Sequence, residues 1–243
     1  MTKVRRVHPA WIAALVTFFT LVATAGFRSA PSVLIVPLEE AFSWSRDDIS
    51  LAVAINILLF GLTAPFAAAL MERFGIRRVV MTALTAVGTG AFSTIFMTKP
   101  WHLIGLWGVV VGIGTGSMAL VFAATIANRW FVARRGLVIG ALTAATATGQ
   151  LIFLPGLSTL AINVGWKSVS LVVACGAYVM VPLIYLFLKE RPSSAGVTAF
   201  GAPVGWVEPV QNKTNAARLA IQSLKEASKV RDFWFLVGSF FVC

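Results

Sequence analysis

The chain has 243 residues, of which 58% are hydrophobic and 12% charged, with a formal net charge of +11. A mean hydropathy of +0.86 excludes an ordinary soluble domain, because helices that are apolar on all sides must be buried in lipid or among other helices. The basic residues are scattered through short segments between apolar runs and form no stripe with interleaved aromatics, which argues against nucleic-acid binding.

Six apolar runs are each long enough to cross a bilayer as a helix, which takes roughly 20 residues. In chain order the predicted spans are Ala10–Leu38, Asp48–Leu70, Val79–Met97, His102–Ala127, Leu137–Ile162 and Ser168–Leu188. The expected fold is therefore an all-α membrane protein, in which residues 1–190 form a six-helix transmembrane bundle. Residues 232–243 are expected to be the truncated start of a seventh helix, near Phe233.

A polar connection, residues 191–231, separates the sixth span from the seventh and is expected to be a cytoplasmic linker. Its first half is rich in glycine and proline, which is typical of irregular structure. In its second half, from Asn215 to Val230, apolar residues recur at helical spacing between lysines, which predicts an amphipathic helix on the inner membrane surface. A solvated linker helix without a specific role is the alternative.

The distribution of lysine and arginine predicts the orientation, because cytoplasmic connections carry an excess of both. Sixteen of these residues lie in the connections on the same side as the amino terminus, and three, Arg46, Lys99 and Lys167, lie on the other side. The amino terminus is therefore predicted to be cytoplasmic. Residues 3–25 also resemble a signal peptide, but apolar character that continues to Leu38 favours an uncleaved first span.

The connection between the second and third spans is short and charged, and runs from Met71 to Arg78. With Ala68 it follows the spacing of a signature found in the major facilitator superfamily: a glycine, three residues, an Asp–Arg pair, and then a glycine followed closely by one or two basic residues. Those positions here are Glu72, Arg73, Gly75, Arg77 and Arg78. The chain thus resembles this superfamily, although Ala68 replaces the signature's first glycine and Glu72 its aspartate.

Further segments resemble the branch that contains monocarboxylate and oxalate–formate carriers. They are Pro37–Arg46, Asn128–Gly136, Gly165–Lys167, Arg191–Pro192 and Asp232–Trp234. The resemblance covers the whole chain but only the amino-terminal half of a twelve-span carrier. It implies two three-helix repeats of inverted topology and alternating access, with the Glu72–Arg78 cluster acting as a latch at the inner gate. Proton-linked drug exporters carry an arginine where this chain has Gly108, which argues against the hypothesis that the chain belongs to a drug–proton antiporter.

Arg28 is the clearest charge at membrane depth, where charged side chains are costly and usually functional. Facing a central cavity, its guanidinium would bind a carboxylate with two hydrogen bonds; if Pro31 ends the helix early, Arg28 would instead reach the outer interface. Asn56 and Gln150 are amides in apolar spans and are the next candidates for lining a substrate cavity. Hydrogen bonding between helices is the competing role for both amides.

The predicted function is secondary transport of a small organic anion, a carboxylate, in a bacterial-type inner membrane. Arg28, Asn56 and Gln150 are the substrate-binding candidates, and we expect no catalytic residues, cofactor or metal site. The expected partners are the lipid bilayer, the anion with a possible coupling proton, and a carboxyl-terminal half that this chain lacks. A carrier for a drug or neutral metabolite is one alternative, and a truncated fragment that does not transport is another.

Overall fold

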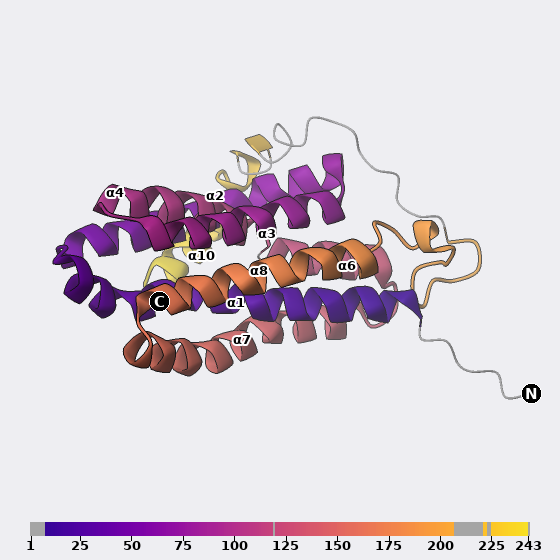
Figure 1. The fold of residues 1–243 in the computed structure, drawn as a ribbon. Helices are drawn as coiled ribbons and strands as arrows, with labels where there is room; N and C mark the ends of the chain where they lie inside the picture. Colours follow the sequence, from indigo (N-terminus) through magenta and orange to yellow (C-terminus); the bar gives the residue numbers. More distant parts are fainter. Residues whose placement is uncertain (1–7, 119, 207–220, 223–224, 243) are drawn as a thin grey trace, which may run out of the picture.

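The computed structural model describes residues 8–118, 120–206, 221–222 and 225–242. Its described residues are almost entirely helical, and six helical spans are long and apolar enough to cross a membrane. These spans run alongside one another as a bundle (Figure 1). The predicted fold class, an all-α membrane protein with six transmembrane helices, is confirmed.

Helix α1 (Pro9–Phe42) is longer than the apolar pattern indicated, and it runs without a break through Pro31 and Pro37. The alternative in which Pro31 ends the helix early is therefore wrong. Polar side chains on α1 bond to the carbonyl groups of the preceding turn, as in the 2.8 Å bond from Thr17 to Ala13, so they add no unsatisfied group at membrane depth.

The second and third spans are α2 (Arg46–Phe74) and α3 (Ile76–Ser93), the latter continued by the short helix η1 (Thr94–Phe96). Ser45 caps α2 by accepting the backbone N–H of Asp48 at 3.2 Å. Helix α2 has charged residues in its first and last turns and α3 has them in its first turn, beyond the predicted spans, because a hydropathy pattern reports the lipid-facing length rather than the helix ends.

The fourth span is not a uniform α-helix. It comprises α4 (Pro100–Leu103), the π-helical segment η2 (Ile104–Val111), α5 (Gly112–Gly116) and α6 (Leu120–Trp130). Hydropathy predicted an ordinary helix here, since it cannot distinguish the two helical forms. π-Helical turns are rare and occur frequently at functional sites, so the contacts of this segment with its neighbouring helix are described below.

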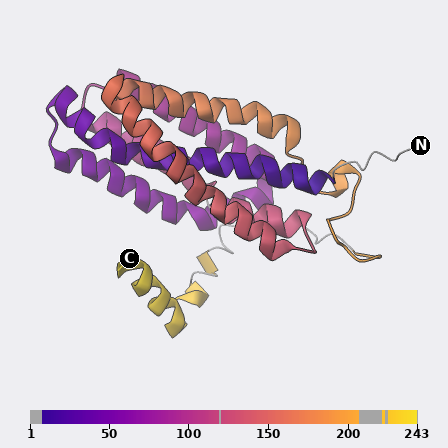
Figure 2. The ribbon, with the colours of Figure 1, turned by 90° about the horizontal axis from the view of Figure 1, so that it is seen from below.

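The remaining spans are α7 (Arg135–Asn163) and α8 (Trp166–Phe187). After α8 come a short 3₁₀ turn, η3 (Ser193–Ala195), and then α10 (Arg231–Val242), which stands apart from the six spans in Figure 2. The division at residues 190 and 231 stays a prediction. Half of the amphipathic helix predicted over Asn215–Val230 lies outside the described residues.

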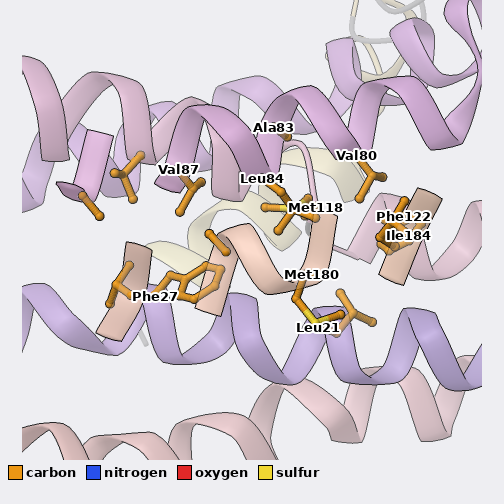
Figure 3. Close-up of a cluster of buried hydrophobic side chains, with 14 of the residues drawn as sticks. Leu21, Phe27, Val80, Ala83, Leu84, Val87, Met118, Phe122, Met180 and Ile184 are labelled. Atoms are coloured by element: carbon orange, nitrogen blue, oxygen red, sulfur yellow. The ribbon is translucent and has the colours of Figure 1, made fainter. Parts of the chain in front are cut away.

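The spans pack in pairs: α1 against α7, α3 against α8, and α2 against the fourth span. Buried side chains from α1, α3, α8 and the fourth span meet in the centre, as Figure 3 shows for Leu21, Leu84, Phe122 and Met180. In lipid such packing is driven by close fit and interhelical hydrogen bonds rather than by water exclusion. The hydroxyls of Thr94 and Ser170, 3.0 Å apart and buried, provide one such bond.

Candidate functional site

The charged connection between α2 and α3 is a one-residue turn. Gly75 follows the last residue of α2 and precedes the first of α3, with φ of 93°. A positive φ of this size is readily adopted only by glycine. The tight turn predicted at this position is present, and it holds the signature's acid and basic pair at the ends of two adjacent helices.

Glu190, just beyond α8, caps the amino terminus of α3. Its carboxylate oxygens accept the backbone N–H groups of Ile76 at 2.8 Å and Arg77 at 2.9 Å. A carboxylate here satisfies amides that lack helical partners and complements the positive end of the helix dipole. The role of Glu190 could not be predicted from sequence pattern, because 114 positions separate it from Ile76.

Glu72 pairs with Arg129 at the end of α6, with Oε1 of the carboxylate 2.8 Å from the guanidinium nitrogen. The arginine side chain is 14% exposed and the carboxylate 45%, so the pair lies at the rim of the bundle. The partner of Glu72 thus comes from the fourth span, whereas Glu190 provides the cap of α3.

Arginines surround this connection. The guanidinium of Arg77 lies 4.1 Å from the ring centre of Tyr185 on α8, and that of Arg73 lies 5.2 Å from the ring of Phe74. A guanidinium stacked on an aromatic face keeps its N–H groups available at the edge for an anion. The residues of the Glu72–Arg78 cluster therefore lie together, at one side of the bundle where ends of α2, α3, α6 and α8 meet. Their role in gating stays a prediction.

Arg28 lies on the surface of the bundle, over a ring of the neighbouring span. Its guanidinium carbon is 4.0 Å from the ring centre of Phe60, which lies midway along α2, fourteen residues from each end. At about 1.5 Å per residue, each end of α2 is roughly 21 Å away. The charge of Arg28 thus lies deep in the membrane-spanning part, and Phe60 is a contact that sequence reasoning did not single out.

Asn56 is buried, with 6% of its surface exposed, and its side-chain amide donates to the carbonyl oxygen of Trp107 at 2.8 Å. Trp107 belongs to the π-helical segment η2, so this bond joins α2 to the fourth span. This is the interhelical bond that the sequence left open for Asn56. A contact with substrate stays a prediction.

Gln150 lies exposed on α7, next to a glycine that packs closely on α1. A β-carbon on Gly149 would lie 2.7 Å from that of Ala25, so α1 and α7 approach each other through this glycine. The three substrate-site candidates thus sit in different settings: Arg28 over α2, Asn56 inside the contact with the fourth span, and Gln150 on the surface of α7.

Residues 16–243 match the family described as Major Facilitator Superfamily. The chain belongs to the major facilitator superfamily. Relatives of the chain in this family are described as transporters. Its six candidate spans give it the multi-pass membrane fold of this superfamily, and the resemblance to the superfamily noted from the sequence is confirmed.

Among superfamily relatives, the chain is 26% identical to an MFS-type transporter, YcxA, from Bacillus subtilis, over 77% of this chain and 46% of that protein. It is 30% identical to monocarboxylate transporter 7 from Homo sapiens, over 65% of this chain and 30% of that protein. The chain thus spans less than half the length of these relatives. The xylose transporter XylE from E. coli, in a partially occluded inward-open conformation, has the same fold, with a TM-score of 0.61 at 17% identity over 89% of this chain and 58% of that one.

Proposed function

We propose that the chain is the amino-terminal half of a superfamily carrier that transports a small organic anion, a carboxylate, by alternating access. One observation carries the proposal: an arginine, Arg28, stands at membrane depth on an exposed face of the bundle. A charge at the centre of a span costs roughly 2.5–3.5 kcal/mol on insertion scales, so such residues rarely face lipid.

The position of Phe60 argues against the alternative in which Arg28 reaches the outer interface. A side chain that snorkels extends toward the nearer helix end, whereas the guanidinium of Arg28 lies over a ring midway along α2. The face that carries Arg28 is therefore the one expected to meet the second half of the carrier around a polar cavity.

Within that cavity the guanidinium would bind the substrate carboxylate through two parallel N–H bonds. Stacking on Phe60 fixes the plane of the group, so less conformational freedom is lost when the anion binds. Gln150, which is exposed on α7, would donate a further hydrogen bond to the substrate. Asn56 would act mainly by holding α2 against η2, because its side-chain amide donates a hydrogen bond to the carbonyl of Trp107.

The similarity to a monocarboxylate transporter supports a carboxylate as the substrate class. The sequence carries no Asp or Glu well inside the six spans, so a coupling proton would travel with the substrate or through the second half. The excess of basic residues supports an inner-membrane carrier with a cytoplasmic amino terminus. On that side the Glu72–Arg78 cluster would latch the two halves when the inner gate closes.

The substrate class is tested by uptake into proteoliposomes that contain the full-length carrier. Radiolabelled monocarboxylates and dicarboxylates are offered beside a neutral sugar and a cationic drug. We expect saturable uptake of at least one carboxylate, competed by other carboxylates and not by the sugar. Saturable uptake of the sugar or the drug, with none of any carboxylate, would overturn the assignment.

A further inference from the structure

A cavity of about 520 Å³ opens where α2, α3, α6 and α8 end together. It is a separate feature from the face of α1 that carries Arg28, since it is built entirely from helix ends on one side of the bundle. The described residues that line it include Arg73, Arg77, Arg78, Arg129, Tyr185 and Glu190.

The charge of this lining is strongly positive. Five of its described residues are arginines and one is a carboxylate. Both oxygens of that carboxylate, Glu190, are engaged by the amides of Ile76 and Arg77, and Arg129 is paired with Glu72. The cavity therefore presents several guanidinium groups to whatever enters it, which is the arrangement that binds phosphate.

One wall of the cavity is apolar. Phe74 and Tyr185 are 50% and 56% exposed, and Met81 lies about one and a half turns inside α3. An inorganic phosphate would gain nothing from this wall. A molecule with an anionic head and an apolar body would contact both the guanidinium groups and the exposed rings.

The cavity also lies at the depth of lipid headgroups. The apolar part of α3 starts at Val79 and that of α8 ends near Phe187, so the arginines around Gly75 and Glu190 stand just outside the hydrocarbon region. Tyrosine is enriched at this interface, and basic pockets between transmembrane helices on the cytoplasmic side bind anionic headgroups.

We propose that this cavity binds the phosphate headgroup of an anionic phospholipid of the inner leaflet, such as phosphatidylglycerol. The phosphate would lie among Arg73, Arg77 and Arg78, and the upper acyl chains would lie along Tyr185 and Met81. The proposal rests on the orientation proposed above, and not on the substrate or on Arg28. Transport could therefore fail its test while lipid binding passes, and the reverse.

The test is lipid retention by the full-length carrier in detergent, measured by native mass spectrometry after exposure to phosphatidylglycerol or phosphatidylcholine. We expect phosphatidylglycerol to be retained preferentially. The double variant Arg73→Gln/Arg78→Gln should weaken that retention by about thirtyfold, given the usual contribution of each basic residue near a charged membrane surface. The matched control, Arg46→Gln/Lys99→Gln, removes two charges from the opposite side and should leave retention unchanged.

A second arm separates the lipid from free phosphate. Inorganic phosphate at tenfold excess over the lipid should fail to displace phosphatidylglycerol, because it lacks the apolar contacts. The unfolding midpoint of each variant is measured in the same detergent, and Arg77→Gln replaces the double variant if that variant does not fold. Equal retention of the two lipids, unchanged retention in the arginine variant, or displacement by inorganic phosphate would overturn the proposal.

Discussion

The carboxylate of Glu190 occupies the space into which a side chain on Gly75 would project. A β-carbon on Gly75 would lie 2.6 Å from Oε1 of Glu190, closer than such atoms approach in real structures. The glycine thus serves both the turn and the cap, since its missing side chain lets a carboxylate from beyond α8 reach the first amides of α3. The end of the sixth span and the start of the third are joined through this contact.

The first prediction concerns Gly75→Ala. Alanine at a positive φ costs about 1–2 kcal/mol anywhere, and here it would also displace Glu190. Gly165→Ala is a matched control, because Gly165 has φ of 105° and nothing within 4 Å of its position for a β-carbon. We expect Gly75→Ala to lower the free energy of unfolding in mixed micelles by about 1–2 kcal/mol more than the control. Equal losses would contradict the contact.

The second prediction concerns the cap itself. Glu190→Ala removes the acceptor for two helix-terminal amides and should cost about 1–2 kcal/mol of unfolding free energy. Glu40→Ala, at an exposed site on α1, serves as the control and should change little. In the Glu190→Ala background, the cost of Gly75→Ala should fall to that of Gly165→Ala. A fully additive double variant would show that the two residues do not interact.

The third prediction concerns the bond between Asn56 and the π-helical segment. Asn56→Ala leaves the buried carbonyl of Trp107 without this donor, which should lower the free energy of unfolding by about 1–3 kcal/mol. Asn163→Ala removes an exposed amide at the end of α7 and should have almost no effect. Indistinguishable midpoints for the two variants would show that the bond contributes nothing to the packing of α2.

The fourth prediction concerns the segment after α8, which folds back onto the bundle. The backbone N–H of Phe200 donates to the carbonyl of Trp130 at 2.8 Å, and its ring contacts Trp11 and Phe131 with centres 5.6 and 5.8 Å away. Phe200→Ala should loosen this docking by about 1–2 kcal/mol, so that limited proteolysis near residues 196–205 becomes about tenfold faster. Val204→Ala, at a fully exposed site, should leave the cleavage rate unchanged.

The six spans could be predicted because each must present a long apolar surface to lipid. Each span is therefore one continuous apolar stretch of the sequence. The turn at Gly75 was predictable for a similar reason, since short charged segments between two apolar runs leave room only for a tight connection. Predicted ends were less accurate. Helix α1 extends to Phe42 rather than Leu38, because its hydrogen bonds continue into the polar interface.

Contacts between residues far apart in the chain could not be predicted from the sequence pattern. The cap by Glu190 and the pair of Glu72 with Arg129 depend on which helix ends meet. The π-helical segment η2 has the same hydropathy as an α-helix, and only its backbone hydrogen bonding distinguishes it. For Arg28 the sequence supplied the charge, and the structure supplied its depth through the contact with Phe60.

The most direct test of the account is carboxylate uptake by the full-length carrier with Arg28 replaced. Arg28→Ala should reduce uptake at least thirtyfold at equal amounts of inserted protein, as the loss of a charged hydrogen-bonded contact of about 2 kcal/mol or more predicts. Arg28→Lys, which keeps the charge without the two-bond geometry, should fall between the wild type and Arg28→Ala. Arg46→Ala, at an exposed site on the opposite side from the Glu72–Arg78 cluster, controls for loss of a charge. Unchanged uptake and unchanged KM in Arg28→Ala would contradict the proposal that this arginine binds the transported anion.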